Sequence, residues 1–227
     1  YVDVDLDTAP DIAIGRLPVS SPDEAATVVT KIVQGGGAFS ADRVMFVADD
    51  ASGDNFASIN DRLAAALPAT ANVQTVAIDD VGASVARASL LGAFTDAVPL
   101  IHYSGHGTVD TLSNGLLAVS DADGLGSTQG LVTLMDCLSG MYHEPLLEGL
   151  GEALVNRPNA GPTVVLSSTG ITSSREQEAL MTAFYDALFA GSAVTVGEAM
   201  NAAKAAVDPE TRNTWILIGD PATRVVQ

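Results

Sequence analysis

Short apolar runs alternate along the chain with longer segments whose apolar residues recur at helical spacing. The short runs predict buried strands, because neighbouring apolar residues are bounded there by Gly, Pro or Asp. The predicted strands cover residues 12–18, 44–48, 73–78, a run from residue 98, 116–119, 131–135, 163–166 and 215–218. The predicted helices cover residues 22–34, 56–67, 83–94, a segment ending at 154, 174–189 and 195–207.

The order of these elements predicts the fold class. Strand and helix alternate, which is typical of an α/β fold with a mostly parallel β-sheet, right-handed crossovers and helices on both faces. A chain of 227 residues with 47% hydrophobic residues has enough apolar surface for one large core. We therefore expect a single domain over residues 1–227.

Two predicted strands stop abruptly at a residue with reactive chemistry. One run leads to His106, between Gly105 and Gly107, and the run at 131–135 leads to Cys137. If these strands are neighbours in a parallel sheet, both side chains project at the carboxyl edge, where ligands bind. A cysteine thiolate beside an imidazole base predicts nucleophilic catalysis. The backbone N–H groups of Gly107 and Cys137 are candidates for stabilising an oxyanion.

Cysteine and histidine are rare in this sequence, so each one needs an explanation. Cys137 is the single cysteine and cannot form an internal disulfide. A lone cysteine is commonly a small buried hydrophobe, but its place after a strand and before a glycine favours a nucleophile. His102 is expected to be a core or rim histidine bonded to backbone, and His143 a surface residue. The spacings among these four residues match no compact zinc-ligand pair.

The charge of the chain limits its partners. With 10 Lys and Arg against 28 Asp and Glu, the formal net charge is −18. Such a chain repels nucleic acid and anionic membranes and favours cationic partners. No apolar run approaches the roughly 20 residues that a membrane-spanning helix needs, so no membrane span is expected. The sequence does not indicate an oligomeric state.

Carboxylates recur at the start of the chain, at Asp3, Asp5, Asp7 and Asp11. Carboxylates at alternate positions are typical of the first half of a calcium-binding loop. The glycine and the closing glutamate of such a loop are missing from this segment. Two interpretations stay open, a calcium site and a solvated acidic strand edge.

The two reactive blocks, Tyr103-Ser-Gly-His-Gly107 and Met135-Asp-Cys-Leu-Ser-Gly140, resemble the histidine and cysteine blocks of caspase-like cysteine peptidases. Within that group the chain resembles the gingipain family, peptidase family C25. Further segments that carry the resemblance are 10–18, 167–170, 184–188, 197–200 and 214–221. Because they span nearly the whole chain, the resemblance implies a caspase-like fold, a Cys137–His106 dyad and endopeptidase activity without an organic cofactor.

The resemblance also implies roles for acidic residues after the strand at 44–48. Gingipains orient the catalytic histidine with an acidic residue from this loop, where Asp49 or Asp50 lies. Asp54 stands where gingipains bind a basic substrate side chain, which implies cleavage after Arg first and Lys second. Without the resemblance, Asp54 is more readily explained as the cap of the following helix.

Other expectations follow from the same resemblance. Ser168 and Thr169, in a segment shared with gingipains, are expected to contact the substrate. Gingipain-like peptidases are secreted or surface-borne and some bind calcium, so export and a calcium ion are expected here. Gingipain catalytic domains carry an additional amino-terminal subdomain, which we expect to be absent from these 227 residues.

Three alternatives to a gingipain-like endopeptidase stay open. The chain is also consistent with a catalytically silent caspase-like module for binding or assembly, with a CHAT-type peptidase, and with a thiol acyltransferase that cleaves no peptide. CHAT peptidases are similar from His106 onward but lack the blocks at 11–18 and 215–221. The intact pair of Cys137 and His106 favours an enzyme over the silent module.

Overall fold

The centre of the computed structural model is a six-stranded sheet in the order β3-β2-β4-β5-β6-β7. The structure describes residues 3–6, 9–126, 130–144, 146–158, 160–190 and 193–226. The strands are β2 (Arg43–Ala48), β3 (Asn72–Ala77), β4 (Leu100–Ser104), β5 (Leu131–Met135), β6 (Val164–Ser168) and β7 (Trp215–Gly219). All neighbouring pairs in this sheet are parallel except β6 and β7, which are antiparallel.

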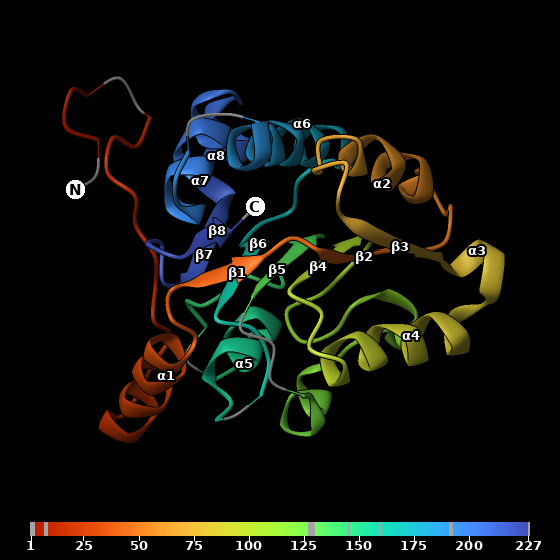
Figure 1. Cartoon of the computed structure of the whole chain (residues 1–227), viewed down its shortest axis with the longest axis horizontal. Coiled ribbons are helices and arrows are strands. Elements are labelled where there is room, and N and C mark those ends of the chain that lie inside the picture. The colour runs from red at the N-terminus through yellow and green to blue at the C-terminus, as the bar shows by residue number, and fades with distance from the viewer. Residues whose placement is uncertain are drawn as a thin grey trace.

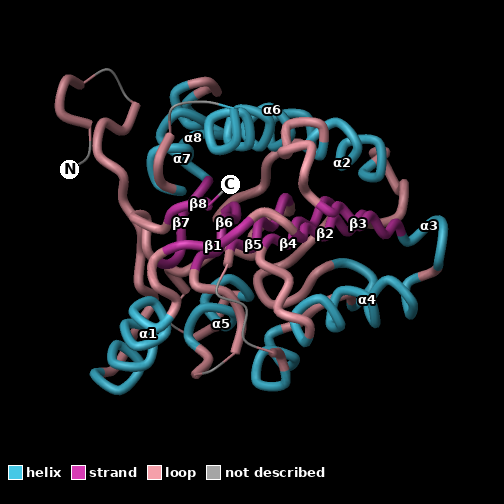
Figure 2. Tube along the Cα trace, in the orientation of Figure 1, coloured by secondary structure: helices cyan, strands magenta, loops and turns pink. Residues whose placement is uncertain are grey.

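Helices cover both faces of the sheet, as Figures 1 and 2 show. One face carries α2 (Phe56–Ala64), α6 (Ser174–Tyr185), α7 (Val196–Ala205) and α8 (Pro209–Thr214). The other carries α1 (Pro22–Gln34), α4 (Ala83–Thr95) and α5 (Leu150–Asn156), and the short α3 (Ile78–Val81) follows β3. The predicted α/β fold with a mostly parallel, doubly covered sheet is therefore confirmed.

Burial on both faces explains why the strand sequences are continuous apolar runs. In β2, Phe46 packs in the hydrophobic cluster under α2 and α6, while its neighbours Met45 and Val47 pack in the cluster over α4. Successive side chains of a strand point to opposite faces, so a covered sheet needs apolar residues at every position. The strand ends are consequently where polar chemistry begins.

Helix starts follow the capping signals in the sequence. Ser21 precedes α1, and its side chain accepts a hydrogen bond from the backbone N–H of Glu24. Ser173 and Thr195 cap α6 and α7 in the same way. These caps satisfy backbone N–H groups that the first turn of a helix leaves without partners.

Several element predictions are wrong. Residues 12–18 form no strand; Arg16 alone makes an isolated bridge to Ile218, and Ile12 and Ile14 are exposed. This segment runs beside the edge strand β7 without regular pairing, and Pro18 at its end has no N–H to donate. Residues 116–119 also form no strand, because short 3-10 turns, η1 (Ser113–Gly115) and η2 (Val119–Gly124), occupy this region.

Several short elements were not predicted from the sequence, among them α3, α8 and the two strands of a second sheet. A small parallel sheet pairs β1 (Ala38–Ser40) with β8 (Arg224–Val226). The predicted helix at 174–189 divides into α6 and a π-helical turn, η3 (Asp186–Ala190). Pairing between segments near the two ends of the chain depends on tertiary structure, which local sequence patterns do not report.

Candidate active site

The register of two strands places the reactive residues at one edge of the sheet. β4 and β5 are parallel neighbours, so the condition stated from the sequence is met, and Ser104 pairs with Met135. His106 and Cys137 each follow two residues after that pair. Both therefore leave the sheet at the carboxyl edge, where α/β proteins bind ligands.

The glycines around His106 are required by close packing. A Cβ on Gly105 would overlap the hydroxyl of Tyr103 and the side chain of Asp49. A Cβ on Gly107 would overlap the carboxyl group of Asp136. The Gly-His-Gly sequence thus lets the histidine loop lie directly against buried side chains on both sides.

Buried polar groups hold the backbone of the histidine loop. Asp49 is 2% exposed, and its Oδ2 accepts a hydrogen bond from the N–H of His106 at 3.0 Å. Its Oδ1 accepts from the N–H of Asp50 at 2.9 Å and from Asn114 Nδ2 at 2.8 Å. The Tyr103 hydroxyl donates to the carbonyl of His106 at 2.8 Å. The peptide groups flanking the ring are consequently fixed.

The His106 imidazole is exposed and has a defined orientation. Its Nε2 lies 3.1 Å from the carbonyl oxygen of Ser52. A carbonyl only accepts, so Nε2 carries the proton and Nδ1 of the neutral ring is left as the acceptor. The ring also meets Phe56 edge-on, with 5.3 Å between centroids. In this tautomer Nδ1 carries a lone pair, and it has no hydrogen-bond partner in the described part of the chain.

Asp50 lies beside the histidine but bonds to the loop around it. Its carboxylate accepts from the N–H of Ser52 at 3.1 Å and from Asn114 Nδ2 at 3.0 Å. Hydrogen bonds from Ser52 and Asn114, with a smaller contribution from His106, lower the pKa of Asp50. In the described part of the chain, the ring of His106 bonds to Ser52 rather than to this carboxylate. Asp50 therefore contacts the histidine through the Ser52 segment.

Cys137 is half-buried and lies in a turn held by a glutamine. Its Sγ is 3.6 Å from the carbonyl oxygen of Thr172 and 4.0 Å from Gln177 Nε2. Gln177, 2% exposed, also donates to the Asp136 carbonyl at 2.9 Å and to the Thr172 hydroxyl at 2.6 Å. The thiol is thus directed toward the segment after β6, and Gln177 connects that segment to the cysteine turn.

Asp136, immediately before the cysteine, is fully buried. Its Oδ1 accepts from the Ser139 hydroxyl at 2.6 Å, which in turn lies 2.5 Å from the Ser167 hydroxyl. Its Oδ2 has no hydrogen-bond partner among the described residues and lies against Gly107. Burial raises the pKa of Asp136 well above its ordinary value. Burial thus disfavours the charged form of a carboxyl group that lies directly beneath the histidine loop.

The two candidate oxyanion donors remain available. Within the described ranges, the backbone N–H groups of Gly107 and Cys137 donate to no protein group. Gly107 follows β4 and Cys137 follows β5, so both lie beyond the carboxyl ends of neighbouring parallel strands. Unpaired N–H groups at such a position are suited to binding a developing negative charge.

Asp54 is exposed in the loop between β2 and α2. It does not cap the helix, because Asn55 is the N-cap and its side chain accepts from the N–H of Ser58 at 2.9 Å. The alternative in which Asp54 serves only as the cap is therefore wrong. Its carboxylate is left at the surface of the loop that also orients His106.

Ser168 and Thr169, the two residues near the end of β6 that were expected to contact substrate, differ in their accessibility to a ligand. Ser168 is buried, and its hydroxyl bonds to the carbonyl and N–H of Gly170 within the turn. Thr169 donates its hydroxyl to the carbonyl of Thr214 at 2.8 Å and lines a cavity at the β7 edge of the sheet. Thr169 is thus better placed than Ser168 to meet a ligand.

The acidic residues near the start of the chain form one cluster. Carboxylate oxygens of Asp3, Asp5 and Asp11 lie within 4.8 Å of one another. Asp11 also accepts a hydrogen bond from the N–H of Val4 at 2.6 Å, which curves the segment around it. Asp7 lies outside the described residues. The three placed carboxylates offer the hard oxygen ligands that Ca²⁺ prefers.

The other two histidines lie away from this chemistry. His102 is fully buried, and its ring bonds to the hydroxyls of Thr133 at 2.6 Å, Tyr185 at 3.0 Å and Ser104 at 2.8 Å. It is a core residue, as expected, but its partners are side chains rather than backbone. His143 is exposed, as predicted.

Sequence reasoning missed four groups that shape the site. Ser52, Asn114 and Gln177 orient the reactive residues through long-range contacts, and Asp136 lies beneath the histidine loop. The Asn114-Gly115 pair signalled a turn, and Asn114 does adopt a left-handed φ of 55°. Ser52 and Gln177 reach partners distant in sequence, which no local pattern marks, whereas Asp136 stands beside Cys137 and accepts from Ser139, three residues on.

Fold and site together define a caspase-like α/β protein with a cysteine and a histidine at the carboxyl edge of its sheet. The chain belongs to peptidase family C25, whose model matches residues 1–226. Comparison with curated protein sequences finds no match.

Solved structures of similar fold include cysteine peptidases. The Arg-specific cysteine proteinase gingipain R is 17% identical, with a TM-score of 0.78 over 98% of this chain and 57% of that chain. The complex of Porphyromonas gingivalis RgpB pro- and mature domains gives 17% identity and a TM-score of 0.81, over 98% and 58%. The Saccharomyces cerevisiae separase–securin complex is 11% identical, with a TM-score of 0.63 over 96% of this chain and 14% of that chain.

The chain thus spans under three fifths of the gingipain chains that it matches, and at this identity the likeness shows the fold alone. Among the described helices, none has both the length and the apolar character needed to cross a bilayer.

Proposed function

We propose that this chain is a cysteine endopeptidase in which Cys137 is the nucleophile and His106 the base. The observation that carries the proposal is the strand register. Ser104 pairs with Met135, and His106 and Cys137 each lie two residues beyond that pair, at the same edge of the sheet. Membership of peptidase family C25 supports it. The tautomer of His106 supports it further, since Nδ1 is left to accept a proton.

The reaction follows from these groups. Nδ1 of His106 takes the proton of the Cys137 thiol, and the thiolate attacks the carbonyl carbon of the scissile peptide. The N–H groups of Gly107 and Cys137 hold the resulting oxyanion. The C–N bond then breaks as the imidazolium gives its proton to the leaving amine. Water, activated by the same imidazole, hydrolyses the thioester and regenerates the thiol.

One observation favours the silent module as a second candidate. In this structure the thiol points toward Thr172 and the ring of His106 toward Ser52, so neither bonds to the other. Catalytic hydrogen bonds are often long or absent until substrate binds, and this geometry is compatible with an enzyme. The labelling rate of Cys137 separates the two candidates.

The decisive experiment combines cleavage with labelling. A random peptide library is incubated with the wild type and with the Cys137→Ala, His106→Ala and His143→Ala variants, and cut sites are mapped. We expect cleavage by the wild type and by His143→Ala, the matched control for an exposed histidine. Rapid iodoacetamide labelling at neutral pH should require His106. Labelling as slow as that of free cysteine, without cleavage, would establish the silent module.

For specificity, we propose cleavage after Arg, and less efficiently after Lys. Asp54 supports this, since it is exposed beside the histidine loop and is released from helix capping by Asn55. A carboxylate binds the planar guanidinium through two hydrogen bonds, whereas Lys offers a point charge. The net charge of −18 attracts cationic peptides to the whole surface.

Substitution of Asp54 tests this specificity. Asp54→Asn should lose most activity on Arg substrates while Cys137 keeps its reactivity toward iodoacetamide. Asp61→Asn, an exposed carboxylate on α2, removes the same charge elsewhere and should retain activity. If Asp54→Asn lost cleavage after Arg and cleavage after uncharged residues equally, Asp54 would not be a specificity residue.

We also propose that Ca²⁺ binds at Asp3, Asp5 and Asp11, with Asp7 as a further ligand from the same segment. The clustering of the three carboxylates supports this. An ion that binds only the folded state raises the melting temperature with its concentration. The melting temperature should be higher in millimolar calcium than in chelator. Asp11→Asn should abolish this difference in melting temperature. An unchanged melt would end the proposal.

A further inference from the structure

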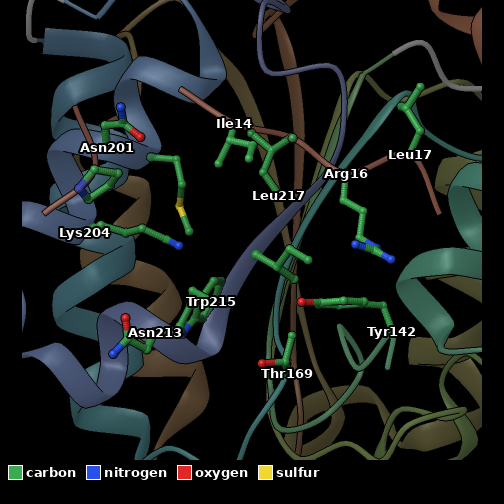
Figure 3. Close-up of a pocket in the computed structure, with 14 residues that line it drawn as sticks. Ile14, Arg16, Leu17, Tyr142, Thr169, Asn201, Lys204, Asn213, Trp215 and Leu217 are labelled. Carbon is green, nitrogen blue, oxygen red and sulfur yellow. The ribbon is translucent and has the colours of Figure 1, made fainter. Parts of the chain in front are cut away.

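A cavity of about 510 Å³ lies at the β7 edge of the sheet (Figure 3). Tyr142, from the segment after Cys137, and Thr169, from the segment after β6, both line it. Trp215 lines it as well and pairs with Ser168, the last residue of β6. The cavity therefore reaches the same carboxyl edge as the candidate catalytic residues, on the side of Cys137 away from β2.

The lining of this cavity contrasts with the charge of the whole molecule. Acidic residues outnumber basic ones 28 to 10, yet no acidic residue of the described chain lines the cavity, and Arg16 and Lys204 do. Arg16 stacks on the ring of Tyr142 at 4.1 Å and also borders a hollow that contains Glu144 and Glu148. Its charge is therefore shared, and Lys204 is the cation that belongs to this cavity.

Lys204 has no ionic partner among the residues that the structure describes. It lies between Asn201 and Trp215 with its ammonium group directed into the cavity (Figure 3). In the described part of the chain its ammonium makes no ion pair or hydrogen bond. Burial, with a smaller contribution from Arg212, lowers the pKa of Lys204 to about 8. A desolvated, unpaired cation is stabilised by an anion brought to it.

A second group in the lining, the indole N–H of Trp215, also lacks a partner within the described ranges. Trp215 is 2% exposed, and its Nε1 donates to no acceptor among the described residues. Buried donors are nearly always hydrogen-bonded, so an unpaired one calls for a ligand or water. Asn201 and Asn213 add amide donors, while Met200 and Leu217 provide apolar contacts. The lining thus suits an anionic oxygen group on a short aliphatic stem.

We propose that this cavity binds the carboxylate side chain of a Glu or Asp in the peptide substrate, at a position other than the residue before the scissile bond. The peptide nature of the ligand rests on the proposed function. The acidic loop with Asp50 and Asp54 follows β2, whereas the cationic cavity lies at β7, across Cys137. The preferred substrate then carries a positive charge on one side of the nucleophile and a negative charge on the other.

Tryptophan fluorescence reports occupancy of the cavity directly, because Trp215 is the single tryptophan. Short peptides with one Glu at successive positions around an Arg, and their Gln counterparts, are titrated into the Cys137→Ala variant. We expect a saturable change with Glu at one position, and binding at least about tenfold weaker with Gln, as for loss of one partner of a desolvated charge pair. Because this assay involves no cleavage, it tests the cavity even if the chain is not a peptidase.

Substitutions assign the effect to Lys204. Lys204→Gln should abolish the preference for Glu over Gln, and Lys204→Arg should retain it. Arg224→Gln removes an exposed positive charge that does not line the cavity and should leave the preference intact. Equal binding of Glu and Gln peptides, no fluorescence change with any Glu peptide, or a preference that survives in a folded Lys204→Gln protein would overturn the proposal.

Discussion

Two histidines, four residues apart on one strand and its extension, lie in opposite environments. His102, within β4, is fully buried and bonds to three hydroxyl groups from Thr133, Tyr185 and Ser104. His106, two residues beyond β4, is exposed, and its ring bonds to a single backbone carbonyl. Burial lowers the pKa of His102 to about 3, so that ring is neutral at any ordinary pH.

The contrast shows that the position of a histidine, rather than its residue type, decides whether its ring is exposed and able to meet a substrate. All available bonds of His102 are used in the core, and Phe46 packs against its ring at 4.9 Å. One ring nitrogen of His106 has no partner among the described residues. Asp49 and Tyr103 fix the loop through the backbone of His106 rather than through its ring. A base needs a rigid backbone and an unoccupied nitrogen, and only the strand end provides both.

The sharpest test of the contrast is loss of activity. We expect His106→Ala to lower kcat/KM for peptide cleavage at least ~100-fold, the lower range for positioned acid–base catalysis, with little change in the melting temperature. The measurement is steady-state cleavage of an Arg-containing peptide, with His143→Ala as the control. Retention of full activity would remove His106 from the mechanism.

The core histidine should show the reverse behaviour. His102→Ala is expected to lower the free energy of unfolding by about 2–4 kcal/mol, because it leaves a cavity and removes the partner of buried hydroxyls. Urea denaturation measures this change. If Cys137 in the folded variant still reacts rapidly with iodoacetamide, the two roles are separate; a stability equal to the wild type would contradict a structural role.

The same histidine should make stability depend on acid. The folded pKa of His102 is about 3 and its ordinary value 6.5, so the unfolded chain binds the proton first as pH falls. The free energy of unfolding should therefore decrease from pH 6.5 to 3, with a slope approaching about 1.4 kcal/mol per pH unit. Carboxylates titrate in part of this window, so the measured quantity is the difference from His102→Gln. Identical slopes in both proteins would show that His102 is not neutral in the fold.

The smallest expected effect concerns the group that orients His106. The ring of His106 bonds to the backbone carbonyl of Ser52, and an alanine at this position would keep that carbonyl. Ser52→Ala should therefore change kcat/KM by no more than about twofold, the range of a surface substitution. A Ser52→Pro variant alters the backbone and should reduce activity much more. A large loss in Ser52→Ala would mean that its hydroxyl, through Asp50, sets the histidine orientation.

The sequence by itself was sufficient for the strands and helices that build the layers. Continuous apolar runs required a sheet covered on both faces, and capping residues such as Ser21 marked helix starts. It also indicated His106 and Cys137, because abrupt ends of apolar runs in a parallel sheet all meet at one edge. These features are local, or follow from topology rules that hold for all sheets.

Tertiary structure alone decided what surrounds those two residues. The Ser52 carbonyl, Asn114 and Gln177 reach the site from segments far away in sequence, and no periodic pattern records such contacts. Residues 12–18 were predicted to be a strand but form only one bridge, at Arg16. A strand requires regular pairing with a neighbour, and the local sequence does not specify that neighbour. The cationic cavity around Lys204 could not be predicted from the sequence either. Its lining residues come from distant segments, and only the fold brings these together without a carboxylate among the described residues of the lining.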